Sequence, residues 1–245
     1  MLERCGRWVL LSAMLAVLAG CATRPDAHPK DPFESFNRGV QGFNEAVDEA
    51  VVKPVAIAYR DITPDPVRTG VSNFFGNLGD VWSTANAVLQ LRPREAAENF
   101  LRVSVNTVFG LGGVLDIASE MGIERTKLDF GLTLGRWGVP TGPYLVLPFM
   151  GPSTLRDTAG MSVESRGDLV QQIDHVPTRN SLFGLRLVDT RTNLLRATTM
   201  LEGVALDKYS FTRDFYLQRR DSQVENAREQ AGNGIGSGRD TDTDN

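Results

Sequence analysis

The sequence predicts an all-α fold with one helical domain over residues 33–220, and three observations support it. Apolar side chains recur with the period of an α-helix in two long segments, 33–51 and 66–90. Prolines and glycines fall between the periodic segments, where helices begin and end. The chain also has no internal repeat with the period of a solenoid.

The first twenty residues have the layout of a secretory signal. Arg4 and Arg7 precede an apolar run over residues 8–19, which is too short to cross a bilayer. The run ends in Leu-Ala-Gly before Cys21, which resembles the lipobox of bacterial lipoproteins. An ordinary signal peptidase site beside a coincidental cysteine is the alternative, but the apolar, small, small, Cys order falls where cleavage is due. We expect residues 1–20 to be removed and Cys21 to carry three acyl chains, each contributing about 0.8 kcal/mol per buried methylene.

Few groups that bind metals or attack substrates remain in the mature chain. Cys5 leaves with the signal and Cys21 is lipidated, so disulfides, thiol nucleophiles and cysteine metal sites are excluded. His28 and His175 are too few for a histidine metal cluster. We expect no metal and no cofactor beyond the covalent lipid. Ala22 stands where an aspartate would signal retention in the inner membrane, which points to the outer membrane.

The charge of the mature chain makes nucleic acid an unexpected partner. Removing Glu3, Arg4 and Arg7 from the totals of 26 basic and 30 acidic residues leaves 24 and 29, a net charge of about −5. No basic patch dominates the sequence, so an electrostatic footprint for nucleic acid is missing.

Both ends of the mature chain are polar. Residues 21–32 are expected to form a lipidated tether, because the segment after Cys21 is polar and rich in proline. Residues 221–245 contain one valine, one isoleucine and no aromatic residue. We therefore expect them to form a disordered tail.

The segment 33–51 is predicted to be an amphipathic helix that Pro54 ends or kinks. Its apolar side chains fall within an arc of about 80° on a helical wheel. They are Phe33, Phe36, Val40, Phe43, Val47 and Val51. Small residues form one flank, where another helix could approach closely. The pattern alone favours a helix on the surface of a soluble core.

The segment 66–90 is predicted to be a second amphipathic helix with a nearly uncharged polar face. Arg68 and Asp80 are its charged residues, while asparagines such as Asn73 and Asn77 fill the rest of that face. Surface helices usually carry several charges. The neutral face therefore indicates burial against polar groups or lipid head groups, or contact between helices through asparagines, and the pattern leaves both open.

Further helices are shorter or less regular. Pro93 fits the first turn of a helix that the glycine-rich break at 110–113 terminates. The expected helices are 93–109, 114–121, 153–162, 185–201 and 207–224.

Residues 137–155 contain no charged side chain. Nineteen uncharged residues could cross a bilayer as a helix, but four prolines remove amide donors that such a helix needs. The centre of this stretch, GPYLVLPFMGP, reads as a rigid apolar loop. It can lie inside a protein core, or at membrane depth if its backbone groups find protein or water partners.

The residues of an enzyme active site are missing from the sequence. No G-x-S-x-G turn, P-loop or H-E-x-x-H helix occurs, and Ser153 lacks the rest of a nucleophile turn. His175 has no partner motif, and Asp48 and Glu49 lie on the polar face of a helix. We expect no catalysis.

Several motifs resemble those of the MlaA (VacJ) lipoproteins. The match covers most of the mature chain and is weakest over residues 163–180. The motifs are DPFESFNR at 31–38, FN at 43–44, KPVA at 53–56, YRD at 59–61, VSNFFGNL at 71–78, DFGLTLG at 129–135, WGV at 137–139, GPYLVLP at 142–148 and LRD at 155–157, with a further echo at 209–220.

The resemblance implies a specific function. Members of the family are outer-membrane lipoproteins that remove mislocalised phospholipid from the outer leaflet and so maintain lipid asymmetry. The expected fold is a helical ring within the inner leaflet, facing the periplasm, with an amphipathic channel. Expected partners are a trimeric porin, a periplasmic MlaC-like carrier that receives the phospholipid, and an inner-membrane ABC transporter complex downstream.

The resemblance and the helical pattern also name candidate residues. Phe43 and Asn44 lie in the helix associated with control of the channel, and neutral polar residues such as Asn73 and Asn77 are channel candidates. The proline-rich loop is expected beside the pore or the membrane. Its named residues are Pro143, Tyr144, Leu145 and Pro148.

Two other functions compete with lipid transport. A structural lipoprotein that braces porins or the cell envelope would move no lipid, and the residues alone do not distinguish it from a transporter. A phospholipase would depend on His175 or Ser153. The missing catalytic constellation disfavours the phospholipase, and the resemblance favours transport.

Overall fold

The computed structural model describes residues 28–202 and 207–236. The predicted signal peptide at 1–20, the lipidation site Cys21 and most of the predicted tether lie outside the described residues. The described end of the tether is tied to the fold, because Asp31 is fully buried and Tyr144 N–H donates to the carbonyl of Lys30 at 2.7 Å.

The first helical segment is one bent rod. It consists of α2 (Glu34–Val47), the π-helical turn η1 (Asp48–Val52) and α3 (Lys53–Ile62). Pro54 lies in the first turn of α3, where its missing N–H breaks the regular hydrogen-bond ladder. The wider π turn before it lets the helix continue with a bend, so Pro54 kinks the segment.

A long helical hairpin follows. α4 (Asp65–Leu89) packs along α5 (Pro93–Val108), and Leu91 at the turn between them adopts φ 54°. The short α6 (Ile117–Glu120) returns beside α5. The predicted bounds of α4 and α5 are correct to within one or two residues, because proline marks both starts.

The next two helices cross at glycines. Asp129 is the N-cap of α7 (Phe130–Arg136), and its carboxylate accepts from Leu132 N–H at 2.8 Å. Thr154 is the N-cap of α8 (Leu155–Gly167). A Cβ on Gly160 of α8 would lie 2.8 Å from the backbone N of Gly131, so the helices touch at their backbones. The sequence patterns did not predict α7, which has only seven residues.

The proline-rich stretch forms a small β-hairpin. β1 (Tyr144–Leu147) pairs antiparallel with β2 (Gly151–Thr154), so the expectation of a rigid loop without strands is wrong for these residues. Pro152 lies in β2 opposite Val146, in a two-stranded sheet where both strands are edges. The predicted helix start at residue 153 shifts to Leu155 for the same reason.

Two long helices complete the chain. α9 (Val176–Glu202) begins earlier than the predicted 185–201, and α10 (Lys208–Gly236) extends beyond the predicted 207–224. The expectation of a disordered tail from residue 221 is therefore wrong up to Gly236. Val224 and Ala227 are buried in this extension, and two apolar residues one turn apart are enough to dock it. Residues 237–245 lie outside the described part.

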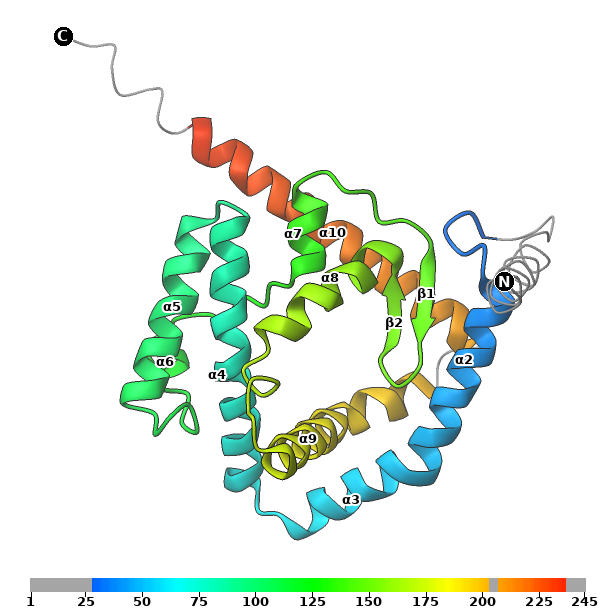
Figure 1. The fold of residues 1–245 in the computed structure, drawn as a ribbon, viewed down its shortest axis with the longest axis horizontal. Coiled ribbons are helices and arrows are strands. Elements are labelled where there is room, and N and C mark those ends of the chain that lie inside the picture. The colour runs from blue at the N-terminus through cyan, green and yellow to red at the C-terminus, as the bar shows by residue number, and fades with distance from the viewer. Residues whose placement is uncertain (1–27, 203–206, 237–245) are drawn as a thin grey trace, which may run out of the picture.

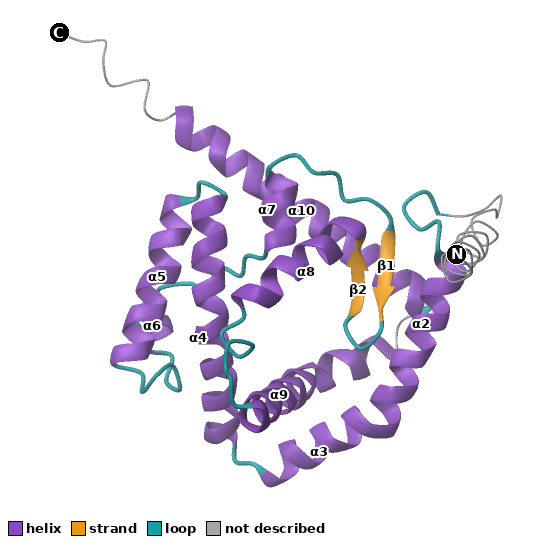
Figure 2. Ribbon diagram, viewed as in Figure 1, coloured by secondary structure: helices purple, strands orange, loops and turns teal. Residues whose placement is uncertain are grey.

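The elements form a closed ring, and the all-α fold is confirmed with a two-stranded sheet as its single β element in the described ranges (Figures 1 and 2). α2, α3, α4, α8 and the hairpin follow one another around the ring (Figure 1). α9 packs against α3 and α4, α10 packs against α7 and β2, and α5 with α6 covers the outer side of α4.

Several polar side chains are fully buried and many large apolar side chains are exposed, in addition to a buried apolar core. Fully buried side chains include Arg102, Asn86 and Asn99, whereas Phe36 and Phe109 are 52% and 71% exposed. Soluble proteins bury apolar side chains and expose charged ones. The expectation that 33–51 covers a soluble core is wrong, because the helix buries Asn37 and turns Phe36 outward. None of the helices described here is long and apolar enough to cross a bilayer.

Candidate functional site

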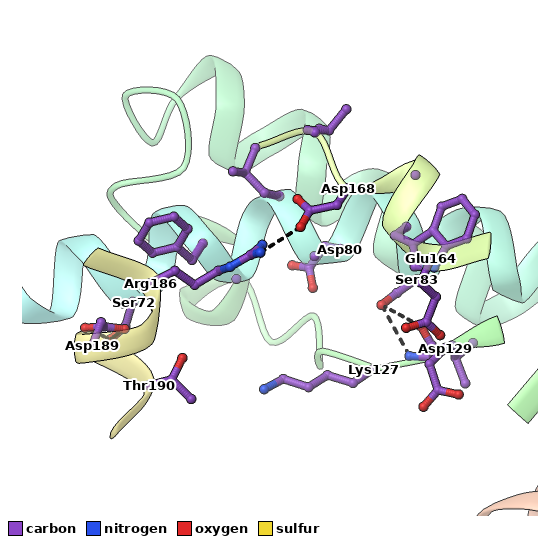
Figure 3. Close-up of a pocket in the computed structure, with 18 of the residues that line it drawn as sticks. Ser72, Asp80, Ser83, Lys127, Asp129, Glu164, Asp168, Arg186, Asp189 and Thr190 are labelled. Atoms are coloured by element: carbon purple, nitrogen blue, oxygen red, sulfur yellow. Dashed lines mark hydrogen bonds and ion pairs between the residues drawn. The ribbon is translucent and has the colours of Figure 1, made fainter. Parts of the chain in front are cut away.

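A cavity of about 820 Å³ lies inside the ring (Figure 3). Its walls come from α4, α8, α9, the segment 125–129 before α7, and Met150 at the tip of the hairpin. Apolar side chains cover part of the wall, namely Phe75, Leu78, Trp82, Leu128, Met150, Met161, Leu169 and Leu194. Hydroxyl, amide and charged side chains cover the rest, so the cavity is amphipathic.

Most charges in the cavity wall are paired. Arg186 binds Asp168 at 2.7 Å across the wall (Figure 3), and Arg125 Nε binds Asp80 at 3.0 Å. Asp129 receives two hydrogen bonds from Arg220 of α10. The pairs cancel most of the electrostatic field that fixed charges would place in the cavity.

Two acidic groups of the wall are without a close cation in the described residues. Asp189 accepts hydrogen bonds from Ser72 Oγ at 2.9 Å, and Glu164 accepts one from Phe130 N–H at 2.6 Å. Burial raises the pKa of both carboxyl groups above the ordinary value, because desolvation disfavours their charged forms.

A buried ion network fixes α4 against α5 and α6. Arg102 is fully buried and donates to Asp80 and to both oxygens of Asp116, at 2.7 and 2.8 Å. Burial alone would raise the pKa of Asp116, but hydrogen bonds from Ser119, Asn106 and Arg102 outweigh it and lower the pKa to about 2. The sequence patterns missed this network, because its members are far apart in the chain.

Two asparagines of α2 hold the hairpin. Asn37 donates to the carbonyl of Tyr144 at 3.1 Å and accepts from Val146 N–H at 2.9 Å. Asn44, two turns later, donates to Leu147 O at 2.9 Å and accepts from Phe149 N–H at 2.8 Å. Each carboxamide binds a carbonyl and the amide two residues later, as a neighbouring strand would. The α2 helix thereby completes the free edge of β1.

An aromatic contact strengthens the hairpin tip. The rings of Phe43 and Phe149 meet edge to face with centroids 5.3 Å apart. Phe149 has φ 63°, a left-handed conformation that is unfavourable for a bulky residue. Asn44 and Phe43 hold this conformation, and Met150 beside it lines the cavity. The predicted gating residues thus contact Phe149, which directly precedes the cavity-lining Met150 in the hairpin.

The structure places the other predicted site residues apart. Asn73 donates to Val114 O and Asn77 to Thr107 Oγ1, so both face α5 and the loop after it, away from the cavity. Neither asparagine lines this cavity, and their channel role stays a prediction. For the neutral face of α4, the bond from Asn77 to Thr107 of α5 favours contact between helices through asparagines.

The named residues of the proline-rich loop divide between core and surface. Tyr144 is fully buried and packs on Tyr209 and Tyr216 of α10, and burial raises the pKa of its hydroxyl. Pro143 and Leu145 are half-buried, and Pro148 is exposed at the tip. The part of this stretch that reaches the cavity is Met150, which the sequence patterns did not single out.

The two candidate phospholipase residues do not form a catalytic pair. Ser153 Oγ lies 2.9 Å from Thr158 Oγ1 and is buried, while the His175 ring bonds Thr178 Oγ1 at 2.8 Å. A nucleophile needs a base within hydrogen-bond reach. These contacts give both residues local structural roles.

The chain resembles named proteins over nearly all of its described length. A family model described as MlaA lipoprotein matches residues 29–223. The intermembrane phospholipid transport system lipoprotein MlaA of Escherichia coli (strain K12) is 37% identical over 211 residues, covering 84% of this chain and 83% of that protein. The protein of the same name from Haemophilus influenzae is 33% identical over 226 residues, covering 88% and 90%.

A solved structure supports the same relationship. It is described as the structural basis for maintenance of bacterial outer membrane lipid asymmetry, and it matches with a TM-score of 0.70 and 34% sequence identity. The match covers 79% of this chain and 98% of the solved one. The relatives are transport lipoproteins by name, which agrees with the expected absence of catalysis. Sequence, fold and structural match agree: the chain belongs to the MlaA lipoprotein family.

Proposed function

We propose that this chain is an outer-membrane lipoprotein that removes mislocalised phospholipid from the outer leaflet through its central cavity. The observation that carries this function is an amphipathic cavity inside a ring that exposes many large apolar side chains. The chain handles lipid without changing its covalent bonds. A structural lipoprotein that only braces porins or the envelope has no need of such a cavity.

The apolar exterior supports a position within the inner leaflet. α2 and α3 expose Phe36, Phe43 and Val51, and the end of α5 exposes Val108 and Phe109. Each such side chain would gain about 1.5–3 kcal/mol on leaving water. Amphipathic helices that do not span a bilayer lie in its interfacial region with their apolar faces buried. Acylation at Cys21 would hold the ring at the same membrane from the periplasmic side.

The cavity supports the passage of an amphiphile. Its size falls in the range of sites that bury small molecules, about 300–1,000 Å³. Apolar wall residues such as Trp82 and Met161 suit acyl chains, while the polar wall suits a head group. Paired charges bind a head group weakly enough for release. The lipid would then pass to a periplasmic MlaC-like carrier and an inner-membrane ABC transporter, with a trimeric porin as the membrane partner.

The hairpin tip supports a gating role for Phe43 and Asn44. Met150 follows Phe149 in the tip and lines the cavity, so a shift of the tip changes the cavity wall. Phe43 and Asn44 determine where the tip lies, through the ring contact and two hydrogen bonds.

Surface labelling of phospholipid tests the proposed function. Cells whose own copy is deleted should show more phosphatidylethanolamine reactive to a membrane-impermeant amine reagent, and this chain should restore the low level. Cys21→Ala should fail to restore it, because the acyl anchor is lost. Equal labelling with and without the chain would refute lipid removal.

A further inference from the structure

Lys127 has an unusual place in the cavity wall. It lies in the extended segment between α6 and α7, and its side chain reaches into the cavity (Figure 3). The backbone on both sides of it is fixed. Asn99 binds both the carbonyl and the N–H of Thr126, at 2.9 and 3.3 Å, and Ser83 Oγ accepts from Leu128 N–H at 3.2 Å.

The residues that fix this segment are themselves buried. Asn99 is fully buried and Ser83 is 5% exposed, and Leu128 packs in an apolar cluster with Ala87 and Leu132. Side chains that are locked by packing and hydrogen bonds hold a neighbouring group in a defined position. The fold therefore fixes the backbone from which the exposed Lys127 side chain extends into the cavity.

The other two cations of the wall are neutralised within the protein. Arg125 binds Asp80 at 3.0 Å, and Arg186 binds Asp168 at 2.7 Å. Within residues 28–202 and 207–236, Lys127 makes no ion pair or hydrogen bond.

Each acidic group of the wall is bound elsewhere. Asp129 pairs with Arg220, Asp189 accepts from Ser72 and Asn193, and Glu164 accepts from Phe130 N–H. None of them neutralises the Lys127 ammonium. Among the described residues, Lys127 is thus the cation of the wall that has no ion pair, and it lies in the same wall as apolar side chains and the carboxyl groups of Asp189 and Glu164.

We propose that Lys127 binds the phosphate of the phospholipid head group while the lipid occupies the cavity. The proposal deepens the proposed function and rests on it. An ammonium is a common partner for a phosphate anion, and the charge-assisted bond is stronger than a neutral one. The adjacent apolar wall, which includes Leu78 and Trp82, suits the acyl chains below the phosphate.

Lipid retention by the purified protein tests this assignment. The mature lipidated chain in detergent is equilibrated with mixed micelles that contain phosphatidylethanolamine or diacylglycerol, which lacks the phosphate, and retained lipid is measured by mass spectrometry. Wild type should retain the phospholipid in preference to diacylglycerol. Lys127→Gln should lower phospholipid retention about five-fold and leave diacylglycerol unchanged, and Lys127→Arg should restore retention.

The control is Arg219→Gln, which removes one exposed positive charge from α10 outside the cavity and should retain lipid like wild type. Inorganic phosphate at the same concentration should not displace the lipid, because it cannot use the apolar wall. Complete displacement would assign Lys127 to free phosphate and overturn the proposal.

Two further outcomes separate the proposals. If Lys127→Gln retains phospholipid as wild type does, the Lys127 assignment is wrong and lipid removal stands. If the wild-type chain retains no phospholipid and also fails to lower surface labelling, both are wrong.

Discussion

Asn37 and Asn44 show how single side chains define the site. Each carboxamide satisfies one carbonyl and one amide of the hairpin, and Asn37 also donates to the buried carboxylate of Asp31 at 2.8 Å. Both lie beside residues that the helical pattern assigns to the apolar side of α2. Their roles depend on the hairpin, about a hundred residues later in the chain, and so could not be read from the pattern around them.

Asn37→Ala should lower the stability of the protein by about 1–3 kcal/mol, because it leaves Tyr144 O and Val146 N–H buried without partners. Thermal unfolding in detergent measures the effect. Gln41→Ala is the matched control on the same helix, since Gln41 bonds only the partly exposed Glu45 within the described residues. Equal melting temperatures for the two variants would contradict the role of Asn37.

The ion network around Asp116 predicts a dependence of stability on pH. The pKa of Asp116 is about 2 in the folded state, below the ordinary value of 3.8, so its charged form stabilises the fold. That contribution is complete above pH 4 and is lost as the pH falls toward 2. Asp116→Asn should therefore lower the melting temperature at pH 6, and its difference from wild type should shrink below pH 4. A difference that stays constant from pH 6 to pH 3 would argue against the ion pair.

At the scale of elements, close helix contacts depend on glycine. Gly160→Ala should destabilise the protein by about 1–3 kcal/mol, because the added Cβ meets the Gly131 backbone and the helices must separate. Gly39→Ala on α2 is the control, since a Cβ there meets nothing within 4 Å. It should gain about 0.5–1 kcal/mol from helix propensity. Thermal unfolding of both variants measures these effects. If Gly160→Ala melts at the wild-type temperature, the two helices are farther apart at this crossing than the structure indicates.

The extension of α10 predicts that the end of the chain is part of the fold. Ending the chain after Asp221 removes Val224, which packs on Leu128 and Leu132, and Arg228, which donates to Gly135 O at 2.8 Å. The melting temperature should fall, whereas ending the chain after Gly236 should leave it unchanged. The same melting temperature for both truncations would indicate that the extension does not dock.

Long helices with a periodic apolar face could be predicted from the sequence, whereas short strands and a polar helix end could not. α4 and α5 have proline at their starts and long periodic faces, so their bounds were accurate. The hairpin was missed because its strands have four residues each and one contains Pro152, and its stability comes from α2 and α10. α10 was cut short because residues 221–236 are polar in composition and dock through Val224 and Ala227.

At the scale of the whole molecule, the helical period of residues 33–51 was correct, while the side that this helix buries was not. Periodicity locates an apolar face but does not say whether protein or lipid covers it. Phe36 and Phe43 therefore indicated a soluble core and lie outside it. The sequence identified the family, and the gating role of Phe43 and Asn44 stays a prediction. The cavity-wall residues Trp82, Lys127 and Asp189, which the ring brings together, were not predicted as site residues.

The central claim is that phospholipid occupies the cavity inside the ring. Photocrosslinking in living cells tests it most directly, with a photoreactive amino acid at Met161 in the cavity wall and at the exposed Asn226 of α10 as the control. Mass spectrometry should find a phospholipid adduct at Met161 and none at Asn226. The claim would be contradicted if a probe at Phe36 captured phospholipid while the Met161 probe captured none. The ring would then lie in lipid, but phospholipid would not enter its cavity.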